Sequence, residues 1–141
     1  MPMLDSYLFF NGNCAEAMNF YAKTLGVKLT ALMKYGDSPD PQGCPAGSED
    51  RVMHTSLVVD GRNLMASDVP KGQEKPIAGF ALSLFYDKPS DVQPIFDALS
   101  QGGSVQMPVG DTFWAQAFGM CTDKFGVAWM VSGGAKNPPP N

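Results

Sequence analysis

The chain carries the same pattern of helix-boundary residues in both halves, and this repeat limits the folds open to it. Asn13 and Ser90, which suit the start of a helix, lie 77 positions apart in the 141-residue sequence. Gly26 and Gly103, which suit the position after a helix, have the same separation. A repeat of this length predicts two copies of one supersecondary unit.

Residues within each expected helix agree with these boundaries. Glu16 and Gln93 follow the two cap positions by three residues, so we expect a capping box at each helix start. Apolar side chains then recur at helical spacing, namely Cys14, Met18, Tyr21 and Leu25 in the first half and Val92, Ile95, Phe96 and Leu99 in the second.

Strands are expected on both sides of each helix. Short apolar runs indicate strands at Leu4–Phe10, Val27–Tyr35, Val52–Val59, Asn63–Ser67, Phe80–Tyr86, 104–108, 115–121 and 127–132. Asp60-Gly61 is a strong hairpin signal, and its counterpart Phe125-Gly126 lies 65 positions later. The separation falls by 12 because the first half contains a long loop, Gly36–Asp50, whose role the sequence leaves open.

This order of elements predicts an α+β fold of two βαβββ units. We expect the units at about residues 4–70 and 77–132, within a single domain over 1–132. The remaining residues, 133–141, are rich in Gly and Pro and are expected to form a disordered tail.

Composition excludes several classes of partner. Ten Lys and Arg residues stand against 14 Asp and Glu residues, without a basic run, so we expect no nucleic-acid partner. No apolar run approaches the ~20 residues of a membrane helix, and we expect no membrane partner. The three cysteines lack the spacing of a zinc site or disulfide framework, and no secretory leader is visible, which favours the cytoplasm.

Three segments of the chain resemble PhnB-like proteins. They are YLFFNGNCAEA at Tyr7–Ala17, DTFWAQAFG at Asp111–Gly119 and TDKFGVAWM at Thr122–Met130. PhnB-like proteins belong to the vicinal oxygen chelate superfamily, which includes glyoxalases and bleomycin-resistance proteins. The resemblance implies paired βαβββ modules that form a curved mixed sheet around a cavity, a small-molecule ligand and a homodimer.

Members of this family often carry the label 3-demethylubiquinone methyltransferase, but the residues argue against that chemistry. A nucleoside methyl donor normally needs a Gly-rich turn between a first strand and its helix. The turn at residues 11–15 contains a single glycine. We therefore expect no methyl-donor cofactor.

The resemblance also implies four strand positions at which related enzymes bind a divalent ion. Counting from the helices and hairpins places them at Ser6, Met65, Ser83 and Met130, or at Phe80 in place of Ser83 if the strand contains a gap. None of these side chains is a useful ligand for zinc, nickel or iron. We expect no metal and no cofactor, and we interpret Ser6, Phe80 and Met130 as ligand-binding candidates.

His54, the single histidine, is the first candidate for catalysis. Strand alternation places it on one face with Ser56, so both are candidates to line a cavity. With a reference pKa near 6.5, an imidazole suits proton transfer at neutral pH. The alternative is a histidine that is only hydrogen-bonded between sheet layers.

Asp68 is the second catalytic candidate, since a carboxylate after Ser67 can orient His54 or meet a ligand. The alternative is an Asp that caps a turn. Trp114 is a candidate ligand-binding residue or a core residue, whereas we expect Trp129 to be core and Cys121 to be a buried, unreactive thiol.

Two functions follow from these residues. The first is a metal-free small-molecule-binding protein that works by sequestration, and the second is a metal-dependent or acid/base lyase, isomerase or dioxygenase of the same superfamily. A third alternative is a dimer whose cavity is filled by its own side chains. The identity of the ligand is not encoded in any motif.

Overall fold

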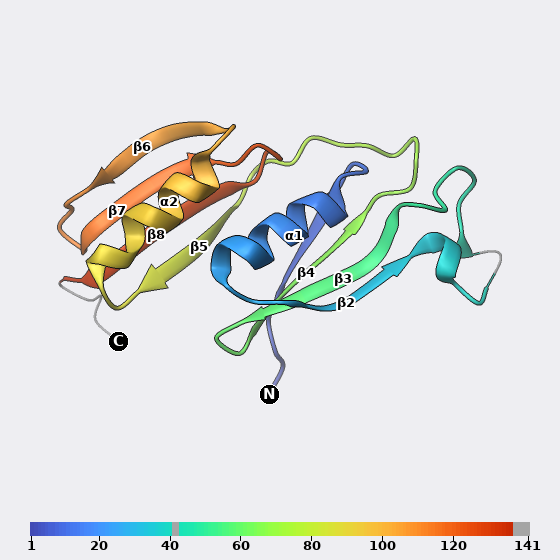
Figure 1. The fold of residues 1–141 in the computed structure, drawn as a ribbon, viewed down its shortest axis with the longest axis horizontal. Coiled ribbons are helices and arrows are strands. Elements are labelled where there is room, and N and C mark those ends of the chain that lie inside the picture. Colours follow the sequence, from blue (N-terminus) through green and yellow to red (C-terminus); the bar gives the residue numbers. More distant parts are fainter. Residues whose placement is uncertain (41–42, 137–141) are drawn as a thin grey trace. The chain divides into compact units, whose positions relative to one another are not determined.

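The structure is a computed structural model that describes residues 1–40 and 43–136. The chain divides into two compact units, Met1–Ile77 and Ala78–Asn141. Each unit contains four strands and one α-helix in the order βαβββ (Figure 1). The predicted α+β fold with two βαβββ modules is therefore confirmed.

The first unit begins with its edge strand and helix. Its elements are β1 (Ser6–Phe10), α1 (Cys14–Leu25), β2 (Leu29–Lys34), β3 (Val52–Val59) and β4 (Arg62–Asp68). The β3–β4 hairpin has positive φ at both Asp60 (48°) and Gly61 (77°), as its turn type requires.

The second unit repeats this order with a shorter helix. Its elements are β5 (Ala81–Tyr86), α2 (Val92–Ser100), β6 (Ser104–Gly110), β7 (Ala115–Thr122) and β8 (Ala128–Ala135). A 3₁₀ turn, Pro89–Asp91, precedes α2. Strand β8 continues through Ala135, so the expected tail over 133–141 begins too early, and residues 137–141 lie outside the described part.

Each unit folds into one four-stranded mixed sheet. The strand order is β1-β4-β3-β2 in the first unit and β5-β8-β7-β6 in the second. In both sheets the first strand of the unit pairs in parallel with the last one, and the other pairs are antiparallel. The first and last strands of each unit are therefore brought side by side.

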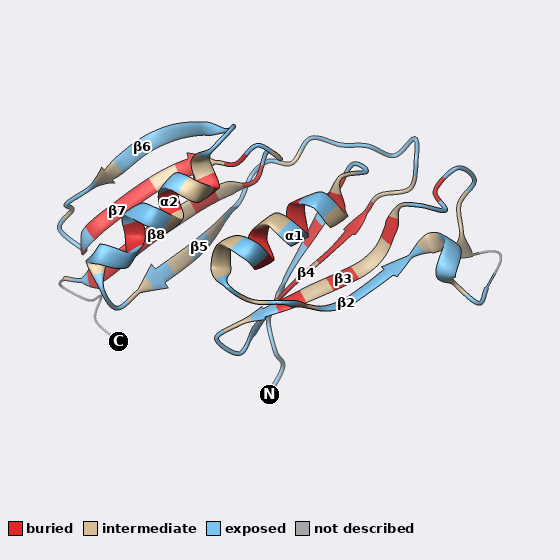
Figure 2. Cartoon of the chain, viewed as in Figure 1, coloured by how far each residue is buried: buried red, intermediate tan, exposed pale blue. Residues whose placement is uncertain are grey.

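One helix covers one face of each sheet. Alternate residues of the strands are buried beneath it, including Leu8 and Phe10 under α1 and Trp129 and Val131 under α2. Figure 2 shows the buried residues concentrated on the two central strands of each sheet and on the helices. The apolar stripes predicted for the helices supply the matching surface, with Tyr21 and Phe96 as their largest buried members.

The helix starts differ from the prediction, because neither capping box forms. Asn13 and Asp91, the residues at the two N-cap positions, make no side-chain cap hydrogen bond. At α1 the carboxylate of Asp68 accepts the hydrogen bond from Cys14 N instead, at 3.0 Å. At α2, Ser90 lies in the 3₁₀ turn and Gln93 donates to Asp97.

No helix within residues 1–40 and 43–136 is long and apolar enough to cross a membrane.

Helix α2 lies close to its sheet at Gly119, which allows a direct test of the packing. A Cβ atom at Gly119 would lie 2.7 Å from the Phe96 ring and 3.0 Å from Val109, both too close. We expect Gly119→Ala to lower the free energy of unfolding by about 1–3 kcal/mol, because the buried ring must shift.

Urea denaturation measures this change, and Gly110→Ala is the matched control. A Cβ atom at Gly110 would meet nothing closer than Pro108 O at 3.9 Å. An equal loss of stability in the two variants would contradict close helix packing at Gly119.

Candidate functional site

Each sheet has a second face that the helix of its own unit does not cover. In the first unit, strand alternation and pairing place one set of side chains on this face, which we call the first open face: Tyr7, Phe9, Met33, His54, Ser56, Val58, Met65 and Ser67. Aromatic and thioether groups on it lie beside hydroxyl groups and one imidazole. Such a mixture is typical of small-molecule sites.

Tyr7 and His54 form the central polar contact of the first open face. Tyr7 Oη lies 3.2 Å from His54 Nδ1, and the ring centroids are 5.8 Å apart. His54 is half-buried and Tyr7 is 39% exposed, so solvent and ligands can reach the pair. Ser56, the next residue on this face of β3, shares a 2.6 Å hydroxyl hydrogen bond with Thr30.

Tyr7 occupies the position predicted for Ser6. The parallel pairing sets Tyr7 beside Met65, whereas Ser6 pairs with Leu64 on the helix-covered side. In the second unit Ser83 lies beside Met130, as predicted. Equivalent residues in the first strands of the two units, Tyr7 and Ser83, are therefore separated by 76 positions rather than 77. A shift of one residue along a strand moves a side chain to the other face of the sheet.

The glycine that ends α2 shows the same shift. Gly102 has the positive φ of a left-handed residue (77°), as Gly26 does (71°), so Gly102 rather than Gly103 is the counterpart of Gly26. The Gly102-Gly103 pair hid this one-residue difference. Residues 7–10 are aromatic or apolar throughout, so only the burial of Leu8 and Phe10 identifies Tyr7 as a residue of the uncovered face.

A second phenol, Tyr35, lies close to the first. Its hydroxyl donates a 3.0 Å hydrogen bond to the carbonyl oxygen of Asp68. Burial raises the pKa of Tyr35, and the neighbouring Tyr7 and Asp68 raise it further against an opposing effect of Arg51. Tyr35 therefore stays protonated at neutral pH and acts as a donor.

Asp68 lies in the framework of the first unit. Its Oδ1 accepts hydrogen bonds from Gly12 N (2.8 Å) and Cys14 N (3.0 Å), and its Oδ2 accepts one from Val52 N (2.9 Å). Within the described residues no hydrogen bond joins Asp68 to His54. The structure thus separates the two catalytic candidates and gives Asp68 the contacts of a cap.

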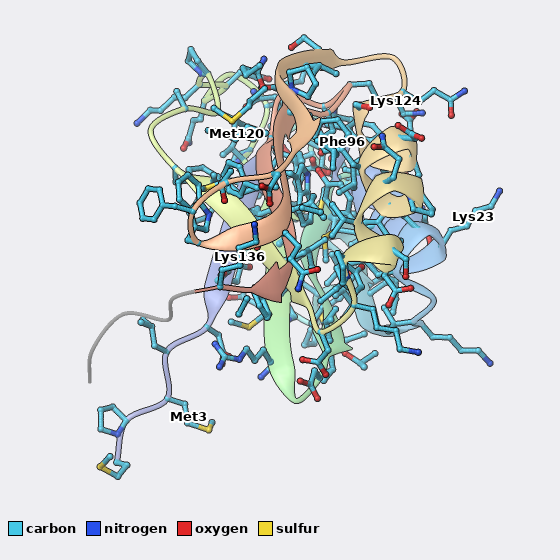
Figure 3. The ribbon with its side chains drawn as sticks, turned by 90° about the vertical axis from the view of Figure 1, so that its left-hand side faces the viewer. Met3, Lys23, Phe96, Met120, Lys124 and Lys136 are labelled. Carbon is cyan, nitrogen blue, oxygen red and sulfur yellow. The ribbon has the colours of Figure 1, made fainter. Side chains whose placement is uncertain are left out.

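In the second unit, thioether and aromatic groups dominate the uncovered face, which we call the second open face. Strand pairing sets Met107 beside Met120, Met120 beside Met130, and Met130 beside Ser83. Figure 3 shows Met120 and Phe96 on opposite sides of this sheet. The three methionines therefore form one row opposite α2.

Trp114 lies just before β7 and is 40% exposed. Its ring meets Phe113 and Phe118 edge-on, with centroid distances of 4.8 and 5.1 Å. Phe118 shares a face with Met120 because the two alternate along β7. Phe80 is exposed and precedes β5, so it lies outside the paired part of the sheet.

Trp129 and Cys121 lie in the core, where they were expected. Trp129 is buried, and its Nε1 donates a 2.8 Å hydrogen bond to the carboxylate of Asp123. Burial, with a smaller effect of Asp123, raises the pKa of Cys121 to about 11. Neither residue is available on the second open face.

The four metal positions of the superfamily do not fit a divalent ion. In the observed register they hold Tyr7, Met65, Ser83 and Met130, which offer neither imidazole nor carboxylate. Residues 1–40 and 43–136 also contain no group of three or more His, Cys, Asp or Glu side chains that could hold a metal elsewhere.

Comparison with known proteins gives one consistent result. The Glyoxalase/Bleomycin resistance protein/Dioxygenase superfamily matches residues 3–131. Protein YjdN of Escherichia coli (strain K12) is 34% identical over 140 residues, which cover 94% of this chain and 95% of YjdN.

Two solved structures resemble the chain over nearly its full length. Protein PA1353 from Pseudomonas aeruginosa has 47% identity and a TM-score of 0.86, covering 94% of this chain and 98% of its own. A Bacillus cereus protein described as a putative 3-demethylubiquinone-9 3-methyltransferase, PhnB protein, has 27% identity and a TM-score of 0.74, covering 94% and 99%. The resemblance to PhnB-like proteins is thereby confirmed.

The contacts of Asp68 predict a large effect on stability. We expect Asp68→Ala to lower the free energy of unfolding by about 3 kcal/mol or more, since each buried donor left without a partner costs ~1–3 kcal/mol. Asp68→Asn keeps one acceptor oxygen, so its loss should be smaller. Thermal and urea unfolding measure both, and a stable Asp68→Ala protein would contradict the framework role.

The cysteines are expected to differ sharply in reactivity. Burial and the charge of Asp68 raise the pKa of Cys14 to about 12, and the pKa of Cys121 is raised to about 11. At pH 8 both are thiols rather than reactive thiolates. Iodoacetamide followed by mass spectrometry should label the partly exposed Cys44 first, and comparable labelling of Cys14 in the folded protein would contradict this.

Proposed function

This chain belongs to the glyoxalase/bleomycin resistance protein/dioxygenase superfamily, and we propose that it is a metal-free small-molecule-binding protein. The observation that carries the proposal is the composition of the two open faces. An uncovered face of a sheet is usually polar, but here exposed aromatic and thioether side chains surround a few hydrogen-bonding groups. Covering such a surface with a partly apolar ligand removes apolar area from water, which favours binding.

The methionine row of the second open face supports a ligand surface that adapts its shape. Met107, Met120 and Met130 have flexible, polarizable side chains that adjust to different partners. Trp114 adds a rigid aromatic wall beside them. We propose Trp114, Met130 and Ser56 as ligand-binding residues, while Phe80 and Ser6 have weaker support from their positions outside the open faces.

The second candidate function is acid/base catalysis as a lyase, isomerase or dioxygenase. The contact of Tyr7 with His54 favours it, because a histidine held by a phenol on an accessible face can transfer a proton. Asp68 supports this function only indirectly, through the framework that holds β3 and β4. If His54→Ala leaves every reaction catalysed by the purified protein unchanged, this candidate is excluded.

We also propose that the protein forms a homodimer and works in the cytoplasm without nucleic-acid or membrane partners. The exposed apolar side chains of the open faces support association, and the three free cysteines suit a reducing compartment. Analytical ultracentrifugation tests the dimer, and a monomer at micromolar concentration would contradict it.

A thermal-shift screen of small molecules tests the proposed function. A ligand that binds the folded state increases the free energy of unfolding, by about 2.7 kcal/mol at a ligand concentration of 100 times its Kd. The unfolding temperature therefore rises with ligand concentration. We expect hits among partly apolar molecules and no dependence on EDTA.

Zn²⁺, Ni²⁺ and Mn²⁺ serve as the matched additions in the same assay. We expect none of them to stabilise the protein, and elemental analysis should find less than one divalent ion per chain. A tightly held ion in stoichiometric amount would overturn the metal-free part of the proposal. A screen without any hit would overturn ligand binding itself.

A further inference from the structure

We infer that His54 presents its Nε2–H group to a ligand that carries a carbonyl or carboxylate oxygen, and that Tyr7 is the positioning residue that holds the imidazole in this state. The inference rests on the proposed function, since it specifies the chemistry of the bound molecule. It also assigns a role to Tyr7, which the sequence pattern did not single out.

The direction of the Tyr7–His54 hydrogen bond follows from the chemistry of the two groups. A phenol is a good donor with a reference pKa near 10, and the unprotonated nitrogen of a neutral imidazole is a better acceptor than a phenol oxygen. Across the 3.2 Å contact we therefore take the hydroxyl of Tyr7 as the donor and Nδ1 as the acceptor. In a neutral imidazole the remaining proton then lies on Nε2.

The second ring nitrogen is left available. Within the described residues Nε2 of His54 has no hydrogen-bond partner, and no buried side-chain nitrogen or oxygen lacks one. Nε2 is therefore reached by solvent. A bound ligand that displaces this solvent must supply an acceptor, or the donor is left unsatisfied.

Neighbouring groups hold Tyr7 in place. The parallel pairing fixes its backbone beside Met65, and its ring lies 5.2 Å from that of Phe9. The hydroxyl of Tyr35, the other phenol nearby, already donates a hydrogen bond to the carbonyl oxygen of Asp68. Tyr7 is thus the phenol that is hydrogen-bonded to His54.

The surroundings of His54 favour an oxygen acceptor on a partly apolar molecule. Met33 pairs beside His54 on β2, and Phe9 and Met65 lie on the same face, so covering them removes water from the donor. A hydrogen bond to a carbonyl or carboxylate oxygen becomes stronger when water is removed. The shared chemistry of the ligand is therefore an oxygen acceptor attached to an apolar body.

Nitrogen-15 NMR tests the state of the imidazole directly, because His54 is the single histidine in the chain and needs no assignment. At a pH where the imidazole is neutral, we expect Nδ1 to be unprotonated and hydrogen-bonded, with the proton on Nε2. Tyr7→Phe keeps the ring and removes the hydroxyl, so the Nδ1 signal should move toward that of a nitrogen without a donor.

Tyr35→Phe is the matched control, since it removes the other nearby hydroxyl and should leave the Nδ1 signal in place. A wild-type protein with its proton on Nδ1 would overturn the inference. So would a Tyr7→Phe protein, shown to be folded by its amide spectrum, whose Nδ1 signal equals that of the wild type.

Benzoate and acetophenone are the probes for the ligand class, with ethylbenzene as the analogue that lacks an oxygen. We expect both oxygen-bearing probes, at millimolar concentration, to move the Nε2 signal, and ethylbenzene to leave it unmoved. Tyr7→Phe should weaken their binding about two- to tenfold, because the imidazole is then no longer held in one orientation and one tautomer and must be ordered on binding. Tighter binding of benzoate would indicate a carboxylate ligand, and tighter binding of acetophenone would indicate a carbonyl ligand.

The outcomes separate this inference from the proposed function. The assigned ligand class is overturned if either oxygen-bearing probe binds without a change in the Nε2 signal. It is also overturned if neither probe binds, even when the thermal-shift screen yields other ligands. A screen without ligands overturns the proposed function itself, whereas the effect of Tyr7→Phe on Nδ1 is measured without any ligand and still decides the role of Tyr7.

Discussion

The carboxylate of Asp68 joins three segments that are distant in sequence. It lies at the end of β4 and accepts hydrogen bonds from the start of α1 and the start of β3. A negative charge at a helix N-terminus is also favoured by the helix dipole. Because these contacts fix where α1 and β3 begin and where β4 ends, the placement of Tyr7, His54 and Tyr35 depends on them.

The division of roles between Asp68 and His54 follows from burial. Asp68 is 2% exposed and surrounded by backbone donors, so its oxygens are used within the fold. His54 lies on the opposite side of the sheet, where no helix of its unit covers it. Asp68 therefore contributes to the geometry of the fold, while the His54 ring is left accessible for the proposed contact with a ligand.

Much of the fold could be predicted from the sequence, because local signals agreed with one another. The strand Val52–Val59 was predicted with the bounds that the structure has, and the Asp60-Gly61 turn marked its hairpin. The helix caps could not be predicted, because the donor at α1 is satisfied by Asp68, which is 54 positions away from Cys14. Sequence patterns within one turn carry no information about such a partner.

The candidate site was predicted in part. Alternation along β3 placed His54 and Ser56 on one face correctly, but Ser6 was assigned the position of Tyr7. The error came from both ends of α2, because Ser90 lies in a 3₁₀ turn before the helix and because either Gly102 or Gly103 can follow a helix end. Tyr35 was missed because its hydroxyl reaches Asp68 across the fold, a contact that no local spacing indicates.

The parallel pairing of first and last strands also has a consequence for the order of folding. In the first unit Ser6 pairs with Leu64, and in the second Ala81 pairs with Ala128, so each sheet closes only when its own last strand has been made. Within the described residues, all four strands of the first sheet come from the first unit. During synthesis the first unit can therefore complete its sheet, including its open face, before the second unit leaves the ribosome.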